Sequence, residues 1–200
     1  MNESERQEFH LDFERALAFA TRLHAPQTRK ETDIPYISHL IAVAGLVLEN
    51  GGDRDQAIAG LLHDSIEDCG EDYPGGVPAL RRDIEAHFGS TVLRIVEGCT
   101  DAETFPKPPY CERKKRYIAH IEDALPEVLL VSCADKLHNA RAIVADLRVM
   151  GVPLFERFNG KRDGTLWYYE TLAEVFERKG PARLAAELRR TVETMKALAG

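Results

Sequence analysis

Four ionisable residues end an otherwise apolar stretch, and their types and spacing could support metal chemistry. His63 and Asp64 follow the apolar run 59–62, and Glu67 and Asp68 come one helical turn later. An imidazole next to a carboxylate can chelate one cation. A carboxylate one turn away on the same helix face can accept a proton from a water at that cation. The alternative interpretation is a helix end that carries a few solvated acids.

Two further candidate ligands lie in apolar surroundings elsewhere in the chain. His39 opens the apolar run 40–48, and Asp135 interrupts the apolar segment 129–137. Alone, His39 could be an ordinary histidine at a helix start and Asp135 an ion-paired helix acid. Together with His63 and Asp64 they form a set of two histidines and two aspartates on three helices. Such a set suits Mn²⁺, Fe²⁺, Co²⁺ or Zn²⁺, with coordination positions left for water.

Composition restricts the classes of protein to consider. The 200 residues are 44% hydrophobic and 30% charged, with a net charge of −7. This is typical of a globular protein and disfavours a broad basic surface for nucleic acid. The acidic N-terminal segment does not resemble a signal peptide, and no apolar run is long enough to span a membrane. We therefore expect a cytoplasmic protein whose cysteines form no disulfides. These cysteines are Cys69, Cys99, Cys111 and Cys133.

Helical periodicity and helix-ending residues predict an all-α fold. No segment has a persuasive strand pattern, and the chain has no internal repeat, low-complexity segment or linker. We expect one domain over residues 1–200, a bundle of about eight to ten helices, with a core of about 13–150 and C-terminal helices at about 165–198. The predicted helices cover 12–24, 40–48, the segment after the capping residue Asp53 through His63–Asp68, 77–88, 90–96, 112–125, 126–150, 165–179 and 182–198.

Proline, glycine and polar residues mark the loops between these helices. The segments concerned are 24–35, 70–76, 99–109 and 151–164.

Five short motifs, in order along the chain, resemble those of one enzyme family. They are His24–Lys30, Pro35–His39, Leu62–Asp68, Val96–Thr100 and Ala134–Asn139. This pattern resembles the HD-domain metal-dependent phosphohydrolases. More closely, it is similar to the hydrolase domain of RelA/SpoT proteins and to stand-alone small alarmone hydrolases of the metazoan SpoT homologue type. Glu112–Lys114 and Trp167–Tyr169 also resemble the stand-alone enzymes.

The resemblance implies a role for each matching residue. The metal ligands would be His39, His63, Asp64 and Asp135, with Mn²⁺ the expected ion. Glu67 and Asp68 would be the pair that activates and orients the attacking water. The substrate contacts would come from Arg29, Lys30 and Asn139. Lys107, with the basic segment 113–116, could bind a phosphate, although a solvated helix face is an equal alternative. Trp167–Tyr169 are more typical of a core.

The implied activity is hydrolysis of the small nucleotide guanosine 3′,5′-bis(diphosphate), ppGpp, at its 3′-pyrophosphate, as in the stringent response. Two alternatives stay open: an enzyme for another phosphate, such as the NADPH 2′-phosphate or a nucleoside monophosphate, and a non-catalytic alarmone sensor. An intact Glu67–Asp68 pair argues against the sensor. The chain departs from the family pattern at Glu31, where glycine is common, at Leu40, where proline is common, and at Ala142, where threonine is common. The sequence does not determine the base preference or the oligomeric state.

Overall fold

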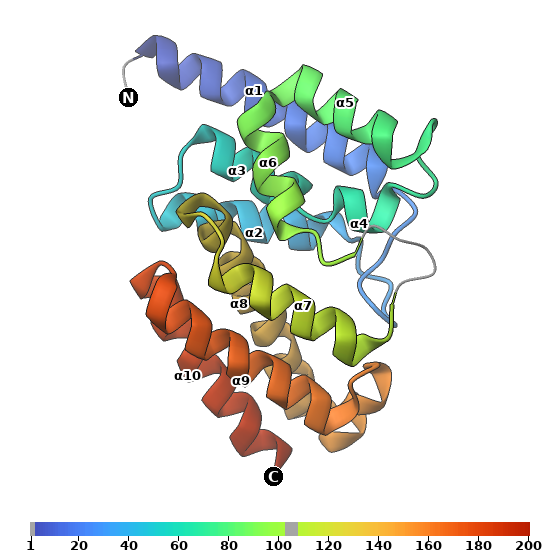
Figure 1. Ribbon diagram of the computed structural model, residues 1–200. Coiled ribbons are helices and arrows are strands. Elements are labelled where there is room, and N and C mark those ends of the chain that lie inside the picture. The colour runs from blue at the N-terminus through green and yellow to red at the C-terminus, as the bar shows by residue number, and fades with distance from the viewer. Residues whose placement is uncertain (1–2, 103–107) are drawn as a thin grey trace. The chain divides into compact units, whose positions relative to one another are not determined.

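The fold is all-α, as the sequence predicts. A computed structural model describes residues 3–102 and 108–200. Within these residues there are ten α-helices, one 3₁₀ helix and no β-strand (Figure 1). The chain divides into two compact units, Met1–Phe105 and Pro106–Gly200, and each is described here by itself. That the whole chain acts as one domain stays a prediction.

The first unit contains six helices. They are α1 (Glu3–Leu23), α2 (Ile37–Glu49), α3 (Arg54–Leu62), α4 (Ser65–Cys69), α5 (Gly76–Phe88) and α6 (Ser90–Cys99). Helix α3 contacts α1, α2 and α6, so it lies at the centre of this unit. The predicted cap at Asp53 is confirmed: its side chain accepts from the Gln56 amide, and the Gln56 side chain accepts from the Asp53 amide. A reciprocal cap of this kind fixes where α3 begins.

Three helices in this unit extend beyond their predicted bounds by three residues or more, and one of them is α2, which begins at Ile37 instead of 40. Helix α1 begins at Glu3, nine residues before the predicted start at 12, and α6 runs to Cys99 instead of ending at 96. The start of α1 is polar and exposed, so hydrophobic periodicity does not reveal it. Acidic residues in the first turn, Glu3 and Glu5, favour a helix there because they complement the positive end of the helix dipole.

The predicted helix through the His63–Asp68 stretch is interrupted, so the expectation of one continuous helix is wrong. Helix α3 ends at Leu62, His63 and Asp64 form a turn, and α4 starts at Ser65. The His63 ring explains the break, because its Nδ1 lies 2.9 Å from the Gly60 carbonyl oxygen. In a continuing helix that oxygen would accept from the backbone N–H of Asp64.

A close approach of two helices brings the histidine-bearing segments together. A Cβ added at Gly60 in α3 would lie 3.1 Å from the Cα and 3.3 Å from the N of Ala44 in α2. These distances are tighter than ordinary van der Waals contact, so a glycine at this position lets the two backbones approach. Helix α2 carries His39 and the end of α3 carries His63, so this contact sets how far apart the two rings lie.

The loop between α1 and α2 folds back on itself. Thr28 and Pro35 form an isolated antiparallel bridge, and the amide of Arg29 donates to the carbonyl of Ile34 at 2.8 Å. A tight turn lies inside this hairpin, with Glu31 at a φ of +55°. Residues other than glycine rarely adopt this left-handed backbone conformation, which is why glycine is favoured at such a position. The departure noted at Glu31 therefore falls on a residue whose backbone suits glycine.

The second unit contains four α-helices and a short 3₁₀ helix. They are α7 (Tyr110–Glu122), α8 (Pro126–Met150), η1 (Val152–Arg157), α9 (Lys161–Lys179) and α10 (Ala182–Ala199). The predicted loop 151–164 is wrong in part, because η1 and the first turn of α9 occupy much of it. The predicted proline in the first turn of α8 and the break at Gly180–Pro181 are confirmed.

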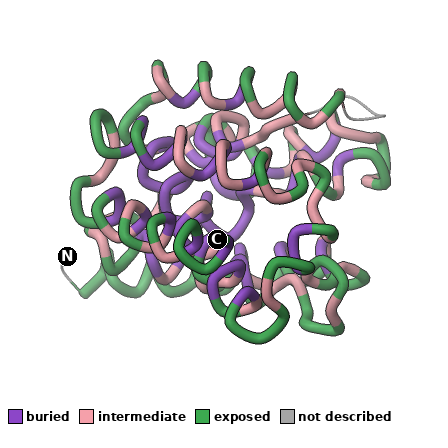
Figure 2. Tube along the Cα trace, turned by 90° about the horizontal axis from the view of Figure 1, so that it is seen from below, coloured by how far each residue is buried: buried purple, intermediate pink, exposed green. Residues whose placement is uncertain are grey.

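The 25-residue helix α8 is the core of the second unit. It packs against α9 and α10, which also pack against each other, and α7 packs on α9 (Figure 1). Helix α8 is apolar around most of its circumference from Val128 to Leu137, whereas most other helices bury only one side, seen as purple stripes in Figure 2. An all-round apolar helix belongs inside a protein, so a carboxylate in this segment needs partners.

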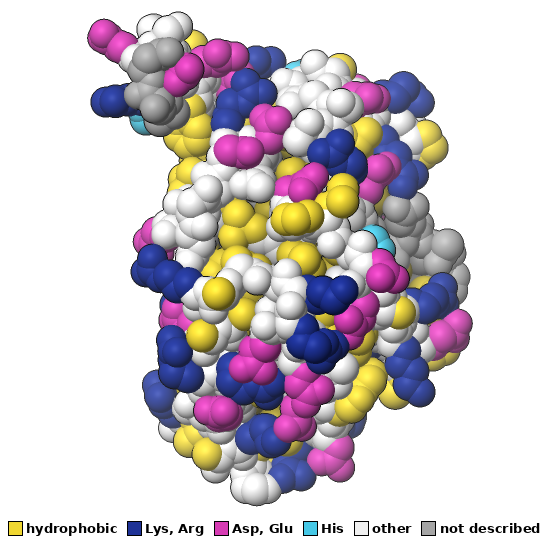
Figure 3. Space-filling model, turned by 60° about the vertical axis from the view of Figure 1, so that its left-hand side comes forward, with side chains coloured by type: hydrophobic (Ala, Val, Ile, Leu, Met, Phe, Trp, Pro, Cys, Tyr) yellow, Lys and Arg dark blue, Asp and Glu magenta, His cyan; other side chains and the backbone are white. Residues whose placement is uncertain are grey.

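The face shown in Figure 3 carries acidic and basic side chains in a mixed pattern. Exposed ion pairs link neighbouring helices in the second unit, such as Arg178 with Glu122 and Arg189 with Glu177. No disulfide joins the four cysteines, as predicted. Within the described residues, no helix combines the length and the apolar character needed to cross a membrane.

Candidate metal and hydrolytic site

Three of the predicted metal ligands converge in the first unit. The Asp64 Oδ2 atom lies 3.0 Å from Nε2 of His63 and 3.6 Å from Nε2 of His39. The two imidazole rings meet edge to face with centroids 5.2 Å apart. Both histidines are almost completely buried, while 19% of the Asp64 side chain is exposed. Two ring nitrogens and one carboxylate oxygen therefore point at one place that solvent can reach from the Asp64 side.

The protonation pattern of His63 follows from its backbone partner. A carbonyl oxygen only accepts hydrogen bonds, so the Nδ1 atom 2.9 Å from the Gly60 oxygen must carry the ring hydrogen. In the neutral ring, Nε2 then has its lone pair directed toward Asp64. A histidine whose other nitrogen is fixed by a carbonyl is typical of metal ligands, because that bond fixes the tautomer and the ring orientation.

These donors fit a divalent transition metal. Imidazole nitrogen and carboxylate oxygen suit Mn²⁺, Fe²⁺, Co²⁺ and Zn²⁺, whereas Mg²⁺ and Ca²⁺ prefer oxygen alone. The candidate ligand atoms of His39 and His63 lie within 4.8 Å of each other, a separation that one ion can bridge.

Tyr36 belongs to this cluster, although the sequence analysis gave it no role. Its hydroxyl donates to Asp64 Oδ2 at 2.6 Å. Its ring stacks on His24 with centroids 5.3 Å apart and meets His39 edge to face at 5.4 Å. The signals in the sequence were its place inside the motif Pro35–His39 and three residues before His39, on the turn that leads into α2.

The fourth predicted ligand, Asp135, lies on α8 in the second unit. It is buried, and its two carboxylate oxygens accept from different side chains: Oδ2 from the Lys136 ammonium and Oδ1 from the Asn139 amide. The predicted substrate residue Asn139 therefore contacts the predicted ligand Asp135. The buried carboxylate has the partners that its position on an apolar helix requires.

Lys136 supplies the positive charge next to Asp135. Burial alone would lower the pKa of Lys136, but the Asp135 carboxylate and the nearby Tyr117 and Tyr168 hydroxyls outweigh it and raise the pKa well above its usual value. The ammonium also lies 4.9 Å from the centre of the Tyr117 ring. Lys136 is therefore a permanent cation that balances Asp135 inside the unit.

The predicted catalytic carboxylates point to different partners. Glu67 is half-buried on α4, and its Oε2 accepts from the Asp101 backbone N–H at 3.2 Å. Asp68 is exposed, and its Oδ2 accepts from the Gln27 amide at 2.9 Å. Glu67 thus turns toward the end of α6, and Asp68 toward the loop between α1 and α2.

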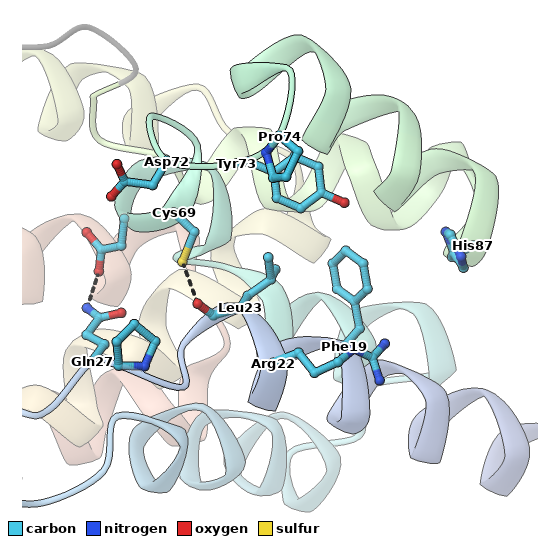
Figure 4. A pocket seen from close by; sticks show the side chains of 11 residues that line it. Phe19, Arg22, Leu23, Gln27, Cys69, Asp72, Tyr73, Pro74 and His87 are labelled. Atoms are coloured by element: carbon cyan, nitrogen blue, oxygen red, sulfur yellow. Dashed lines mark hydrogen bonds between the residues drawn. The ribbon is translucent and has the colours of Figure 1, made fainter.

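Asp68 also lines a cavity of about 700 Å³ in the first unit (Figure 4). Aromatic and proline side chains form much of its wall, with polar groups between them. The lining includes Phe19, Tyr73, Pro26, Pro74, Arg22 and Asp72. Figure 4 shows Gln27, whose side chain donates to Asp68, at one end of this cavity and His87 at the other.

Polar contacts in the wall of this cavity join α4 to the end of α1 and the loop that follows. The His24 Nδ1 lies 2.5 Å from Gln27 Oε1, and the Cys69 thiol donates to the Leu23 carbonyl at 3.6 Å. Burial lowers the pKa of His24, although Gln27 and the nearby carboxylates oppose this, so we expect a neutral ring. Burial and the carboxylates of Asp68, Asp64 and Asp72 raise the pKa of Cys69 to about 12, so it stays a thiol and is a poor metal ligand.

The predicted substrate residues fall in both units. Arg29 is half-buried, with its guanidinium carbon 5.6 Å from the centre of the Tyr36 ring, and the neighbouring Lys30 is exposed. Lys107 lies outside the described residues. Of the basic segment 113–116, Lys114 lies over the Tyr168 ring at 4.6 Å. Tyr168 and Tyr169 are buried, which agrees with the alternative that they belong to the core.

Comparison with known proteins places this architecture in a family. Residues 16–164 match the HD domain family. The MESH1 guanosine-3′,5′-bis(diphosphate) 3′-pyrophosphohydrolase of Xenopus tropicalis is 39% identical over 129 residues, and that of Homo sapiens is 38% identical over the same length. Each alignment covers 63% of this chain and 66% of the relative, so the chain spans just under two thirds of the length of these relatives.

A solved structure matches over a larger share of the chain. It is that of a metazoan orthologue of SpoT that hydrolyses ppGpp and plays a role in starvation responses. The TM-score is 0.72 at 26% identity, and the match covers 91% of this chain and 94% of that one. The family match includes all four predicted metal ligands and both residues of the Glu67–Asp68 pair. The chain therefore belongs to the HD domain family.

Proposed function

We propose that this protein is a metal-dependent pyrophosphohydrolase that converts ppGpp and water into GDP and pyrophosphate. The observation that carries the proposal is the convergence of His39, His63 and Asp64 in a chain that belongs to the HD domain family. The activity printed for the MESH1 relatives supports the choice of substrate. The structural likeness to a ppGpp-hydrolysing protein supports it as well.

The metal site we propose consists of His39, His63, Asp64 and Asp135, with Mn²⁺ as the ion. The first three are supported by their geometry, and Asp135 by the family pattern and by its burial on α8. A divalent ion in this set would lower the pKa of water and offset charge on the phosphoryl oxygens. That the family match extends across both units supports one catalytic domain built from the whole chain.

The attacking water would be handled by Glu67 and Asp68. Glu67 is half-buried one turn after Asp64, so its carboxylate is the candidate to accept the proton. The backbone N–H of Asp101 orients it by donating to Oε2. Asp68 would orient the water or the substrate next to it.

The nucleotide would be held by cationic and polar groups. Arg29 and Lys30 are proposed to bind its phosphates, since guanidinium and ammonium groups pair strongly with phosphate oxygens. Asn139 is proposed to contact the sugar or base, and Lys107 a phosphate. In a protein with a net charge of −7, such local cations are needed to attract a polyanion. A role in the stringent response and a cytoplasmic location stay predictions.

A substrate panel tests the proposal. The purified protein with Mn²⁺ would be given ppGpp, NADPH and nucleoside monophosphates, and phosphate and pyrophosphate would be detected separately. We expect pyrophosphate and GDP from ppGpp at the highest kcat/KM. Phosphate from NADPH in place of this would assign the enzyme to another nucleotide, and tight ppGpp binding without turnover would make it a sensor.

A further inference from the structure

Tyr36 lies directly before α2 and contacts Asp64, 28 residues further along the chain. Its hydroxyl donates to Asp64 Oδ2 at 2.6 Å, the same oxygen that faces both histidines. A hydroxyl-to-carboxylate bond of this length is charge-assisted and about twice as strong as a bond between neutral groups. The hydroxyl therefore restricts the rotation of the Asp64 carboxylate.

The ring of Tyr36 contacts the proposed nucleotide loop as well as a proposed metal ligand. One neighbour is His24, stacked at an interplanar angle of 20°, and another is the Arg29 guanidinium, 5.6 Å from the ring centre. The third is His39, which meets the ring at 65°. One side chain thus contacts Arg29 in the loop, and His39 and Asp64 in the metal cluster.

We infer that Tyr36 is a positioning residue that links the nucleotide-binding loop to the metal ligands. Its hydroxyl fixes the Asp64 carboxylate in the orientation that faces His39 and His63, and Arg29 and His24 hold its ring in place. The inference rests on the proposed metal site and adds a residue to which the family pattern gave no role. It also predicts that changes at Arg29 reach the metal site through Tyr36.

The Tyr36→Phe variant tests this inference directly. It keeps the ring and its neighbours but removes the hydroxyl from Asp64. Isothermal titration with Mn²⁺ alone, without nucleotide, should show an affinity about 10- to 100-fold weaker than that of the wild type, as is typical when the partner of a metal ligand is lost.

Tyr73→Phe is the matched control. Tyr73 also donates to an aspartate, Asp83 Oδ2 at 2.5 Å, and it is also half-buried in the first unit. Its loss should leave the Mn²⁺ affinity within about twofold. Melting curves in EDTA should show similar shifts for the two variants, because each loses one hydroxyl-to-carboxylate bond.

The link to the loop is tested by Arg29→Met, which removes the guanidinium and keeps an unbranched side chain. With Tyr36 present, this change should weaken Mn²⁺ binding about two- to fivefold, the size expected for one cation–π contact. In the Tyr36→Phe background it should have no further effect, because the ring then has no hydroxyl that acts on Asp64. A purely structural role of Tyr36 would give additive effects.

The outcomes distinguish failure of the positioning role of Tyr36 from failure of the proposed function. Stoichiometric Mn²⁺ binding by the wild type, unchanged in Tyr36→Phe, would overturn the positioning role and leave the proposed function standing. Absence of Mn²⁺ binding by the wild type would overturn both. If Tyr36→Phe does not fold, Arg29→Met alone decides, since an unchanged Mn²⁺ affinity in that variant removes the link.

Discussion

Two pairs of ionisable residues, four positions apart in the sequence, have very different surroundings. His63 and Asp64 lie in a turn between α3 and α4, where His63 is buried and Asp64 faces two imidazoles and a tyrosine hydroxyl. Glu67 and Asp68 lie on the short helix α4. Glu67 accepts a bond from the backbone amide of Asp101, and Asp68 is exposed and accepts from the loop side chain of Gln27.

The difference separates a preorganised site from an adjustable one. Burial and several fixed partners restrict His63 and Asp64 to one arrangement, which is what a metal site requires. Glu67 is only half-buried and Asp68 is exposed, and Gln27, which donates to Asp68, lies on a loop. Such groups can reorient toward water or substrate during a reaction cycle, so we expect substitutions at the two pairs to fail in different ways.

The largest effect is expected for Asp64→Ala. The variant loses the carboxylate that faces both buried imidazoles. We expect stoichiometric Mn²⁺ and activity both to disappear, because metal sites of few ligands depend on each of them. Elemental analysis and rate assays on one preparation measure this. Asp72→Ala removes an exposed acid in the same unit and should retain both, and a tightly held ion in Asp64→Ala would refute the ligand assignment.

Glu67→Gln should separate chemistry from metal binding. Glutamine keeps the shape and can still accept from the Asp101 amide, but it cannot take a proton from water. General-base catalysis contributes about 10²- to 10⁴-fold, so kcat should fall by that factor while the Mn²⁺ content is unchanged. Steady-state kinetics with metal analysis check this. Loss of the ion would make Glu67 a ligand, and full activity would make it a solvated helix acid.

Asp68→Asn should have a smaller effect than Glu67→Gln. Its carboxylate is exposed and bonded to Gln27, and asparagine can still accept from that amide. We expect a loss on the order of tenfold in kcat/KM, about the free energy of one hydrogen bond to a charged group. The Gln27→Ala variant removes the other partner and should give a loss of similar size. A decrease of 10³-fold or more in kcat for Asp68→Asn alone would make Asp68 a proton acceptor.

Gly60→Ala tests whether the spacing of α2 and α3 sets the distance between the buried rings of His39 and His63. The new methyl group would meet the Ala44 backbone at 3.1 Å, so α2 and α3 must move apart by a few tenths of an ångström. Overpacking costs about 1–3 kcal/mol, and the higher helix propensity of alanine recovers about 1 kcal/mol of this. We therefore expect the free energy of unfolding to fall by roughly 1 kcal/mol and Mn²⁺ binding to be weaker. Denaturant titration measures the first quantity and calorimetry the second.

Gly45→Ala is the control for this change. Like Gly60 in α3, Gly45 lies inside a helix, here α2, but a Cβ added at Gly45 has nothing within 4 Å. Alanine should stabilise this position by up to about 1 kcal/mol through helix propensity alone, and Mn²⁺ affinity should not change. Equal effects at the two glycines would show that the α2–α3 contact does not set the spacing of the histidines.

The sequence was sufficient to predict the fold class and most helices, because both depend on local patterns. Asp53 and Pro126 mark helix starts, and Gly51 and Gly89 follow helix ends. The polar first half of α1 was missed since no apolar face marks it. The break at His63–Asp64 was missed because it depends on a side-chain bond to the Gly60 carbonyl, which apolar periodicity does not reveal.

Residue types in the sequence were sufficient to suggest the proposed metal ligands but not the residues that contact them. A histidine or aspartate in an apolar run is conspicuous, whereas a tyrosine at a helix start or a glutamine in a loop is not. Tyr36 and Gln27 lie within the motifs Pro35–His39 and His24–Lys30, but only the fold reveals their contacts with Asp64 and Asp68, 28 and 41 positions away in the chain. Tertiary packing determines which side chains contact these carboxylates, so such contacts are difficult to predict from a single sequence.

The smallest effect is expected in the loop, at Glu31. Its φ of +55° costs an ordinary L-residue about 1–2 kcal/mol, whereas glycine adopts it freely but loses about 0.5–1 kcal/mol more conformational entropy on folding. Glu31→Gly should therefore raise the unfolding free energy by roughly 0.5–1 kcal/mol, a shift of about 1–4 °C in Tm. Lys30→Gly, at a residue without positive φ, relieves no backbone strain and should lower Tm. A lower Tm in both variants would mean that the interactions of the Glu31 side chain outweigh its backbone strain. The loop between α1 and α2 would then be more firmly held than its exposure suggests.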